Sequence, residues 1–309
     1  MTGSLSAGVR TVLLGASRNR FLRRSAAKYG MRLGAARFVA GRSLEQFVPI
    51  ARELNARGFA IATAILGEGI ASRSEAAGVT AAYGDVLDRI AAEGLNANVA
   101  LKLTHLGLNV DPEIAFTNLQ GLLERAGRTA NRIRIDMEES AYVDVTLQTY
   151  ERLRAAGFDN VGVVLQAYLY RSADDLERLS SLKPNVRLVK GAYLEPQSVA
   201  FPRKADVDAN YLNLIECALA ANGYTAIATH DEAIIAAAKA MAERLRLPRS
   251  GRFEFQMLYG IRPDLQRRLV GEGYVVRIAA PFGPDWFPYF MRRLAERPEN
   301  LGFVLRNLT

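Results

Sequence analysis

Short apolar runs rich in β-branched residues recur along the chain, and amphipathic stretches of helical period separate them. A run that is apolar at nearly every position is typical of a strand covered on both faces, as in a parallel sheet. The predicted strands are 60–66, 97–103, 132–137, 161–168, 186–193, 225–230, 253–258 and 274–281. The clearest predicted helices between them are 73–91, 112–126, 143–154, 205–220 and 232–246.

Strand and helix alternate eight times in this pattern, which predicts an α/β fold, a single (β/α)8 barrel of the TIM type. A doubly wound sheet is the alternative, but the glycine-rich dinucleotide fingerprint is missing after the first strand. We expect residues 1–58 to form an N-terminal helical segment that packs on the barrel, and residues 59–309 to form the barrel. A C-terminal helix, about 286–297, is expected to lie over the strand ends.

The composition is that of an ordinary globular protein, with 50% hydrophobic and 23% charged residues among 309. No apolar run approaches the roughly 18 residues that a membrane-spanning helix needs, and no secretory signal is expected. Cys217 is the only cysteine, so an internal disulfide and a thiolate metal cluster are excluded. We therefore expect a cytoplasmic protein, with a peripheral place on the inner membrane face as a further option.

The net charge of +8 is concentrated in residues 1–42, which contain nine Arg and Lys residues and no acid. One interpretation is an arm that contacts an anionic surface such as membrane headgroups. The other is a solvated basic face on helices that pack against the main domain. Aromatic residues are few in this segment and no zinc-finger or RNA-binding signature follows it, so nucleic acid is not an expected partner.

Polar and charged residues interrupt the apolar runs near their C-terminal ends, where barrel enzymes carry their chemistry. Such groups are costly inside a strand unless they are paired or used. A ring of them, contributed by every strand, therefore predicts an active site. They are Glu68, Lys102, Thr104, Asp136, Gln166, Arg187, Lys190, Tyr193, Thr229, His230, Asp231, Glu254, Gln256 and Arg277.

The residue types in this ring narrow the chemistry without deciding it. The chain has only two histidines, too few for a multi-histidine metal site, so no metal is expected. No G-x-S-x-G elbow is present, which argues against a serine hydrolase. A Schiff-base barrel lyase or aldolase with Lys102 or Lys190 as nucleophile stays open, as does a non-catalytic binding barrel. The adjacent pair Arg292 and Arg293 suits a bound carboxylate, and equally a stripe on a surface helix.

Six segments follow one another in the predicted barrel: Arg134-Ile-Asp-Met-Glu138, Leu165-Gln-Ala-Tyr168, Arg187-Leu-Val-Lys-Gly-Ala-Tyr193, Ala228-Thr-His-Asp231, Glu254-Phe-Gln-Met-Leu258 and Tyr289-Phe-Met-Arg-Arg-Leu-Ala-Glu296. Taken together, in this order and across about residues 55–305, they resemble the proline dehydrogenase family. In size the chain is similar to the monofunctional bacterial members. The resemblance implies FAD bound without a Rossmann domain, and oxidation of L-proline to 1-pyrroline-5-carboxylate with electrons passed to a quinone. The basic residues 1–42 would then contact anionic lipid near that quinone.

The resemblance also implies roles for single residues. Asp136 and Arg187 are the implied catalytic residues, with Arg187 near flavin N5 and Asp136 positioning Lys102. The implied flavin-binding residues are Met137, Gln166, Arg187, Lys190, Gly191, Ala192, Thr229 and His230. The implied substrate-binding residues are Lys102, Tyr193, Leu258, Ala279, Tyr289, Arg292 and Arg293, of which Lys102, Arg292 and Arg293 hold the substrate carboxylate. Glu68 and Glu296 are implied as a gate, through their pairing with Arg292.

Position 279 departs from the family pattern R-x-Y-x-P-x-G in the eighth strand. The stretch here is Arg277-Ile-Ala-Ala-Pro-Phe-Gly283, with Ala279 where the tyrosine is expected. A methyl group leaves room beside the substrate ring, so 4-hydroxyproline or another substituted proline becomes the alternative substrate. If Phe282 or Tyr289 fills that space, proline remains the expected substrate.

Overall fold

The structure is a computed structural model, and it describes residues 35–67 and 70–296. The parallel strands β1 to β8 form a closed barrel in sequence order, so the predicted (β/α)8 fold is confirmed. The strands are β1 (Ala60–Thr63), β2 (Ala97–Leu101), β3 (Ile133–Ile135), β4 (Val161–Gln166), β5 (Asn185–Val189), β6 (Tyr224–Ala228), β7 (Phe253–Leu258) and β8 (Val276–Ala279). The α-helices are α3 (Leu44–Ala56), α4 (Arg73–Ala92), α5 (Pro112–Gly127), α6 (Val143–Ala155), α7 (Ser172–Ser180), α8 (Lys204–Ala220), α9 (Glu232–Arg244), α10 (Pro263–Gly271) and α11 (Trp286–Glu296). Three short 3-10 helices complete this part of the chain, η1 (Ala35–Arg37), η2 (Thr104–Leu106) and η3 (Ser140–Tyr142).

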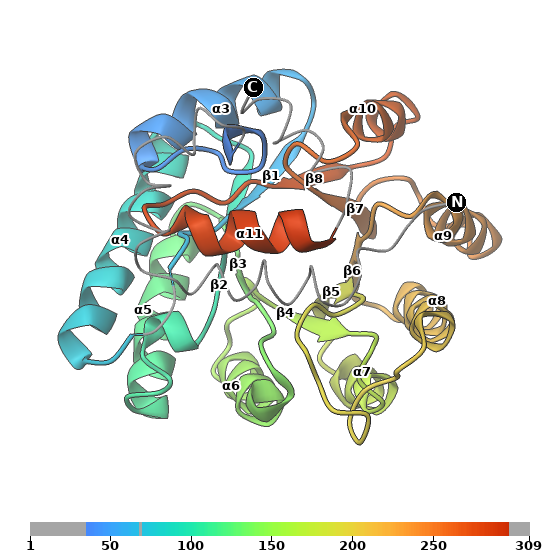
Figure 1. The fold of residues 1–309 in the computed structure, drawn as a ribbon, viewed down its shortest axis with the longest axis horizontal. Helices are drawn as coiled ribbons and strands as arrows, with labels where there is room; N and C mark the ends of the chain where they lie inside the picture. Colours follow the sequence, from blue (N-terminus) through green and yellow to red (C-terminus); the bar gives the residue numbers. More distant parts are fainter. Residues whose placement is uncertain (1–34, 68–69, 297–309) are drawn as a thin grey trace.

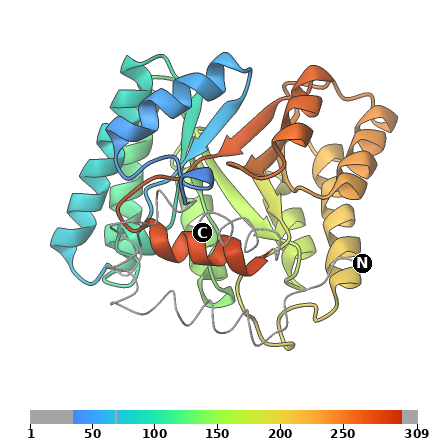
Figure 2. The same ribbon diagram turned by 45° about the horizontal axis from the view of Figure 1, so that its top comes forward.

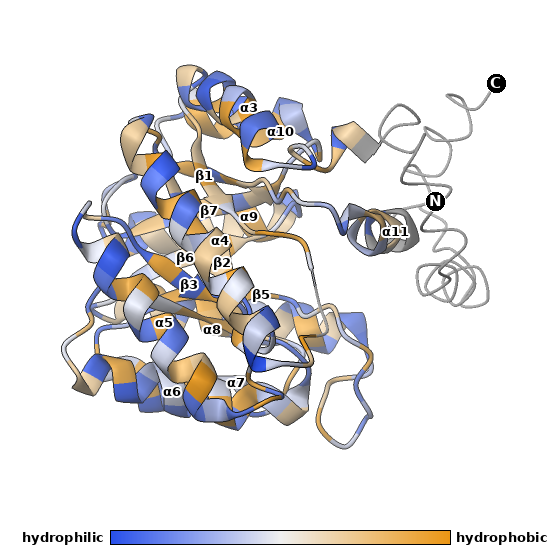
Figure 3. Cartoon of the chain, turned by 90° about the vertical axis from the view of Figure 1, so that its left-hand side faces the viewer, coloured by the Kyte–Doolittle hydropathy of each residue, from blue (hydrophilic) through white to orange (hydrophobic). Residues whose placement is uncertain are grey.

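Helices α4 to α10 surround the barrel, and α3 lies beside α4 and β1 (Figure 1). Their apolar faces and the outward faces of the strands form one continuous core. The strands are largely hydrophobic, whereas the helices are hydrophilic on the sides that face outward (Figure 3). This distribution agrees with the apolar runs in the sequence, because both faces of each strand are covered.

Several strands end earlier than the apolar runs predict. The run 186–193 contains β5 only as far as Val189, and Gly191 then takes a φ of +112°. Lys190 and Tyr193 therefore lie in the loop that follows β5. Similarly, β2 ends at Leu101, so Lys102 follows the strand instead of ending it.

Helix α11 lies across the end of the barrel at which the strands finish (Figures 1 and 2). It is held there by a small apolar cluster, separate from the main core, in which Trp286, Phe290 and Met291 contact Phe38 and Val39. The Phe290 ring lies 6.1 Å from the Phe38 ring and 5.9 Å from the Trp286 ring, measured between centroids. The expected helix over the strand ends is thus present. The segment that precedes α3 packs against it through Phe38 and Val39.

The barrel closes where β8 pairs with β1. Ala60 lies opposite Arg277 in this pairing, and beyond it the amide of Ala280 donates to the carbonyl of Ala62 at 2.9 Å. The Thr63 hydroxyl donates to the carbonyl of Ala280 at 3.0 Å. These contacts join the first and last strands of the chain into one sheet.

The predicted N-terminal helical segment is described only in part, because residues 1–34 lie outside the described ranges. Within the described part, α3 packs through Phe47, Ala51 and Leu54 into the main core. The amide of Ala40 donates to the carbonyl of Pro281 at 2.8 Å. The described part of this segment therefore packs against the barrel.

Candidate active site

Asp136 and Arg187 meet inside the barrel near the ends of β3 and β5. The guanidinium Nη1 of Arg187 lies 2.5 Å from Oδ1 of Asp136. The Nε atom of the same guanidinium donates to Oε1 of Gln256 on β7 at 2.6 Å. The side chain of Arg187 is only 11% exposed. Arg187 is thus held by a counter-ion and an amide from two other strands, and Asp136, expected to position Lys102, pairs with Arg187.

Lys190 follows β5 and lies between two carboxylates. Its Nζ atom is 2.5 Å from Oδ1 of Asp208 on α8 and 3.4 Å from Oδ2 of Asp231, the N-cap residue of α9. Lys204 also pairs with Asp208, and the two lysines together lower the pKa of that carboxyl against the opposing effect of burial. An ammonium bound to two carboxylates is poorly placed to act as a nucleophile, which weakens the Schiff-base alternative at this position.

Gly191 brings the backbone after β5 against an aromatic ring. A Cβ atom at this position would lie 2.2 Å from Cδ1 of Tyr168, and the φ of +112° is one that side chains rarely tolerate. The amide of Tyr168 donates to the carbonyl of Lys190 at 2.8 Å. A glycine is therefore required here, because any side chain would collide with the Tyr168 ring that packs against this backbone. Ala192, the next expected flavin residue, lies in the same loop.

Thr229 and His230 form the turn between β6 and α9. The Thr229 hydroxyl accepts from the amide of Asp231 at 3.1 Å, and Oδ1 of Asp231 accepts from the amide of Ala233. The ring atom Nε2 of His230 accepts from the amide of Leu258 at 2.9 Å, so the tautomer present carries its proton on Nδ1. These bonds cap the turn and join His230 to the end of β7.

Glu138 is a buried acid that the sequence reasoning did not single out. Burial raises the pKa of Glu138, and the Thr104 hydroxyl, which donates to it at 2.7 Å, and the Lys102 charge oppose that rise. The Gln166 amide donates to the Glu138 carbonyl at 2.9 Å, which links the ends of β3 and β4. Met137, beside it, is buried. The sequence held a signal for this residue, because Glu138 lies two positions after Asp136 and ends the first of the segments that resemble the family.

The expected substrate wall combines β7, β8 and α11. Leu258 pairs in register with Ala279, and both Leu258 and Tyr289 pack against the cluster beneath α11. The guanidinium of Arg293 lies 5.0 Å from the centroid of the Tyr289 ring. Tyr193 lies in the loop that follows β5 and is partly exposed. Of the remaining expected residues, Glu68 lies outside the described residues, and the side chains of Arg292 and Glu296 on α11 are also outside the description.

Phe282 does not fill the space beside Ala279. Its ring stacks on Phe47 of α3, with centroids 5.1 Å apart and planes 22° apart, and it belongs to the main core. Phe282 is thereby held on the outside of the barrel. Of the two side chains expected to compensate for the missing tyrosine, only Tyr289 remains.

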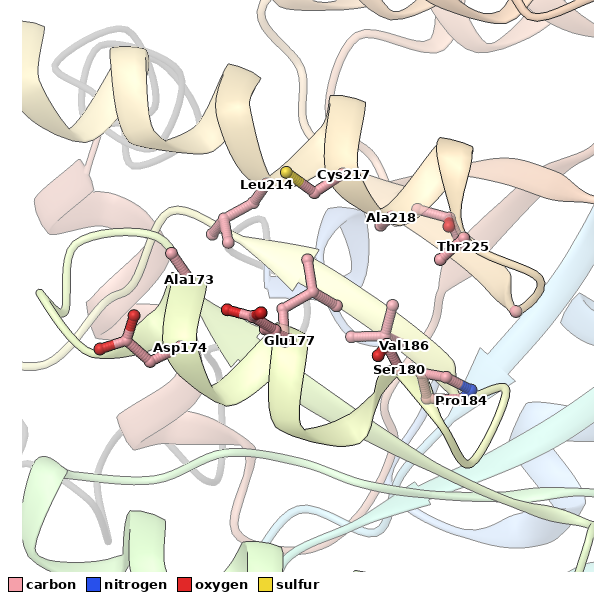
Figure 4. Close-up of a pocket in the computed structure, with 13 residues that line it drawn as sticks. Ala173, Asp174, Glu177, Ser180, Pro184, Val186, Leu214, Cys217, Ala218 and Thr225 are labelled. Atoms are coloured by element: carbon pink, nitrogen blue, oxygen red, sulfur yellow. The ribbon is translucent and has the colours of Figure 1, made fainter.

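Two cavities among the described residues lie away from the C-terminal ends of the strands. One, of about 280 Å³, is on the exterior between α7 and α8 and reaches the beginnings of β5 and β6; Leu214 and Cys217 line it (Figure 4). The other, of about 500 Å³, opens at the opposite end of the barrel beside Asn98 and Arg132. Neither is lined by a residue that the resemblance assigns to the site. Among the described residues we find no cluster of potential metal ligands and no helix long and apolar enough to cross a membrane.

Comparisons with known proteins bear on the family and on the fold of the chain. The family model described as proline dehydrogenase matches residues 48–306. "Proline dehydrogenase 1" of Bacillus subtilis (strain 168) is 45% identical over 97% of this chain and 99% of its own length. "Proline dehydrogenase" of Deinococcus radiodurans is 42% identical over 89% of each chain. A crystal structure of proline utilization A (PutA) from Bdellovibrio bacteriovorus, inactivated by N-propargylglycine, superimposes on 92% of this chain with a TM-score of 0.82 and 25% identity. The chain spans 36% of that longer protein.

Proposed function

The chain belongs to the proline dehydrogenase family, and on this premise we propose that it oxidises L-proline to 1-pyrroline-5-carboxylate with bound FAD and passes the electrons to a quinone. Proline dehydrogenase is the activity of this family, and proline is its substrate. The observation that carries the proposal is the partly buried Asp136–Arg187 ion pair inside the barrel. A fixed cation at this place can stabilise negative charge that develops in a neighbouring ring.

The loops after β5 and β6 supply groups that suit a dinucleotide cofactor. Gly191 turns the backbone after β5, and Lys190, which pairs with Asp208 and Asp231, places an ammonium group beside the beginnings of α8 and α9. Thr229 and His230 lie beside these groups at the end of β6 and would contact the ADP part. When bound, the flavin supplies the hydride acceptor. Met137, Gln166 and Ala192 complete the proposed flavin-binding set.

Three cations are proposed to hold the substrate carboxylate: Lys102, Arg292 and Arg293. Such an anchor fixes the orientation of the proline ring, and a correctly oriented substrate has a lower barrier to reaction. The same positive charges disfavour the ammonium form of the substrate nitrogen, whose lone pair must be available. Glu68 and Glu296 are proposed to pair with Arg292 and close the site over the substrate.

The direct test is the absorption spectrum of the purified protein together with a substrate panel and an artificial electron acceptor. We expect flavin absorbance, FAD in the denatured supernatant, and bleaching of the flavin by L-proline. A colourless protein with no FAD on denaturation would refute the flavoenzyme. An adduct trapped by borohydride on Lys102 would instead support the Schiff-base alternative.

A second candidate substrate is 4-hydroxyproline or another substituted proline. The observation in its favour is the packing of Phe282 on Phe47, which keeps that ring away from Ala279. Space beside Ala279 can hold water or a substrate hydroxyl that a tyrosine ring would exclude. The substrate panel therefore includes trans-4-hydroxy-L-proline.

A further inference from the structure

Glu254 is a buried carboxylate in the barrel interior to which the resemblance gives no role. It lies on β7 and is 1% exposed. Its Oε1 atom accepts from Nε of Arg277 at 2.7 Å and from Nε2 of Gln256 at 2.5 Å, and its Oε2 atom accepts from the Tyr224 hydroxyl at 2.9 Å. Burial alone would raise the pKa of Glu254, but the Arg277 guanidinium holds that pKa below its ordinary value. Glu254 is therefore a buried carboxylate that accepts three hydrogen bonds.

Gln256 connects this carboxylate to the active-site arginine. Its Nε2 atom donates to Glu254, and its Oε1 atom accepts from Nε of Arg187 at 2.6 Å. A carboxylate can only accept hydrogen bonds and a guanidinium can only donate them, whereas an amide has one group of each kind. Glu254 and Arg187 thus determine which way the Gln256 amide faces.

Arg187 is consequently held at two points that come from different strands. Gln256 of β7 binds its Nε atom, and Asp136, which follows β3, binds its Nη1 atom at 2.5 Å. Two hydrogen bonds to different atoms of a planar group fix the plane as well as the position. Such a group needs no reorganisation when charge develops beside it.

We propose that Glu254 acts through Gln256 as a positioning residue for Arg187, so that a hydrogen-bonded chain from Arg277 sets the orientation of the active-site guanidinium. This inference rests on the proposed function, because the consequence we test is the stability of reduced flavin beside Arg187. Released from Gln256, the guanidinium can turn about its own axis and stabilises the reduced ring less.

The principal test is the Gln256→Met variant of the flavin-loaded protein. Methionine has a similar length but neither donates to Glu254 nor accepts from Arg187. We expect its preference for reduced over oxidised flavin to fall about tenfold, equivalent to a midpoint potential about 30 mV lower. The rate of flavin reduction by proline should fall, whereas KM should change little because the proposed carboxylate anchors lie elsewhere.

Tyr224→Phe is the matched control. It removes a donor from the same buried carboxylate, but from the Oε2 atom, and leaves the contact between Gln256 and Glu254 in place. Its midpoint potential should equal that of the unmodified protein. A shift as large as that of Gln256→Met would show that any disturbance of Glu254 lowers the potential, and would overturn the path through Gln256.

Gln256→Glu keeps the inference testable if Gln256→Met fails to fold. A protonated glutamic acid can donate to Glu254 and accept from Arg187, as the amide does, whereas the ionised form repels Glu254 and neutralises Arg187. The difference in potential from the unmodified protein should therefore grow as the pH rises. A difference that is constant with pH would contradict the proposed positioning.

Flavin content and midpoint potential distinguish a failure of the proposed function from a failure of the proposed positioning. If the unmodified protein holds no flavin, the proposed function is refuted. If flavin is bound and reduced by proline, and Gln256→Met has the unmodified midpoint potential, the proposed function stands and the role of Glu254 and Gln256 is refuted.

Discussion

At position 279 the eighth strand carries a methyl group where the resemblance leads us to expect a tyrosine ring. Ala279→Tyr restores a rigid apolar surface beside the proposed substrate ring. We expect kcat/KM for proline to rise about tenfold, equivalent to about 1.4 kcal/mol of added contact in the transition state, and kcat/KM for trans-4-hydroxy-L-proline to fall. Both substrates are measured on one preparation. If the two values move together, position 279 does not contact the substrate.

Gly191 is a second residue whose effect can be stated in advance. Gly191→Ala should destabilise the protein by more than the ~1–3 kcal/mol of an unfavourable backbone conformation, because its Cβ would lie 2.2 Å from the Tyr168 ring. Flavin content should fall with it. Denaturant unfolding and the ratio of flavin to protein absorbance provide the measurement.

Gly157→Ala is the control for that prediction. Gly157 has a φ of +89° and no atom within 4 Å of its would-be Cβ, so only backbone strain is added. Flavin content should then be unchanged. Equal losses of flavin in both variants would mean that backbone strain alone, and not contact with Tyr168, explains the effect.

Single residues also show where prediction from sequence stops. Arg187 and Asp136 could be selected because a charge inside an apolar strand needs a partner or a use. Their pairing could not, since the two residues are 51 positions apart and the partner depends on the barrel's register. The contact between Arg187 and Gln256 spans 69 positions, and nothing local in the sequence identifies it.

At the scale of elements, the length of a helix decided whether the hydrophobic pattern of the sequence predicted it. Helices α4, α5, α6, α8 and α9 are each at least 13 residues long and show a periodic apolar face. Helices α7 and α10 have nine residues each, so their few buried positions do not repeat often enough to be distinguished from a loop. Strand ends were overestimated for a related reason, because an apolar run does not show where a glycine such as Gly191 turns the chain.

Helix α11 is the element whose packing a single substitution can weaken most easily. Its contacts belong to a small cluster separate from the main core. Phe290→Ala removes a ring that touches both Phe38 and Trp286. We expect KM for proline to rise at least tenfold, which corresponds to about 1.4 kcal/mol of lost docking free energy, with a small change in the global Tm.

Hydrogen exchange of α11, compared with that of α8, checks this prediction for Phe290→Ala. Amides of α11 should exchange faster in the variant, while those of α8 remain protected. A large fall in Tm with unchanged KM would mean that α11 is part of the global folding unit and does not act as a locally docked cover.

At the scale of the whole molecule, the charge distribution predicts a surface interaction. Residues 1–42 carry nine of the basic residues and no acid, so attraction to anionic vesicles should weaken as added salt shortens the Debye length to about 10 Å near 0.1 M. Co-sedimentation with vesicles of anionic and of neutral lipid, over a salt series, measures it. Equal binding to both vesicle types would exclude an electrostatic contact, and a variant with Arg18, Arg20, Arg23 and Arg24 changed to Gln locates the charge responsible.

The closure of β8 on β1 has a consequence for how the protein is made. Ala280, the hydrogen-bond partner of Thr63, is synthesised 217 residues after it. At about 5–20 residues per second, translation keeps the edge of β1 unpaired for about 10–40 seconds. During that time the nascent chain exposes a strand edge that can pair with other chains. The ring of strand ends is completed only when β8 leaves the ribosome, and α11 emerges later still. A ribosome that stops short of β8 therefore releases an open, aggregation-prone sheet with no assembled site.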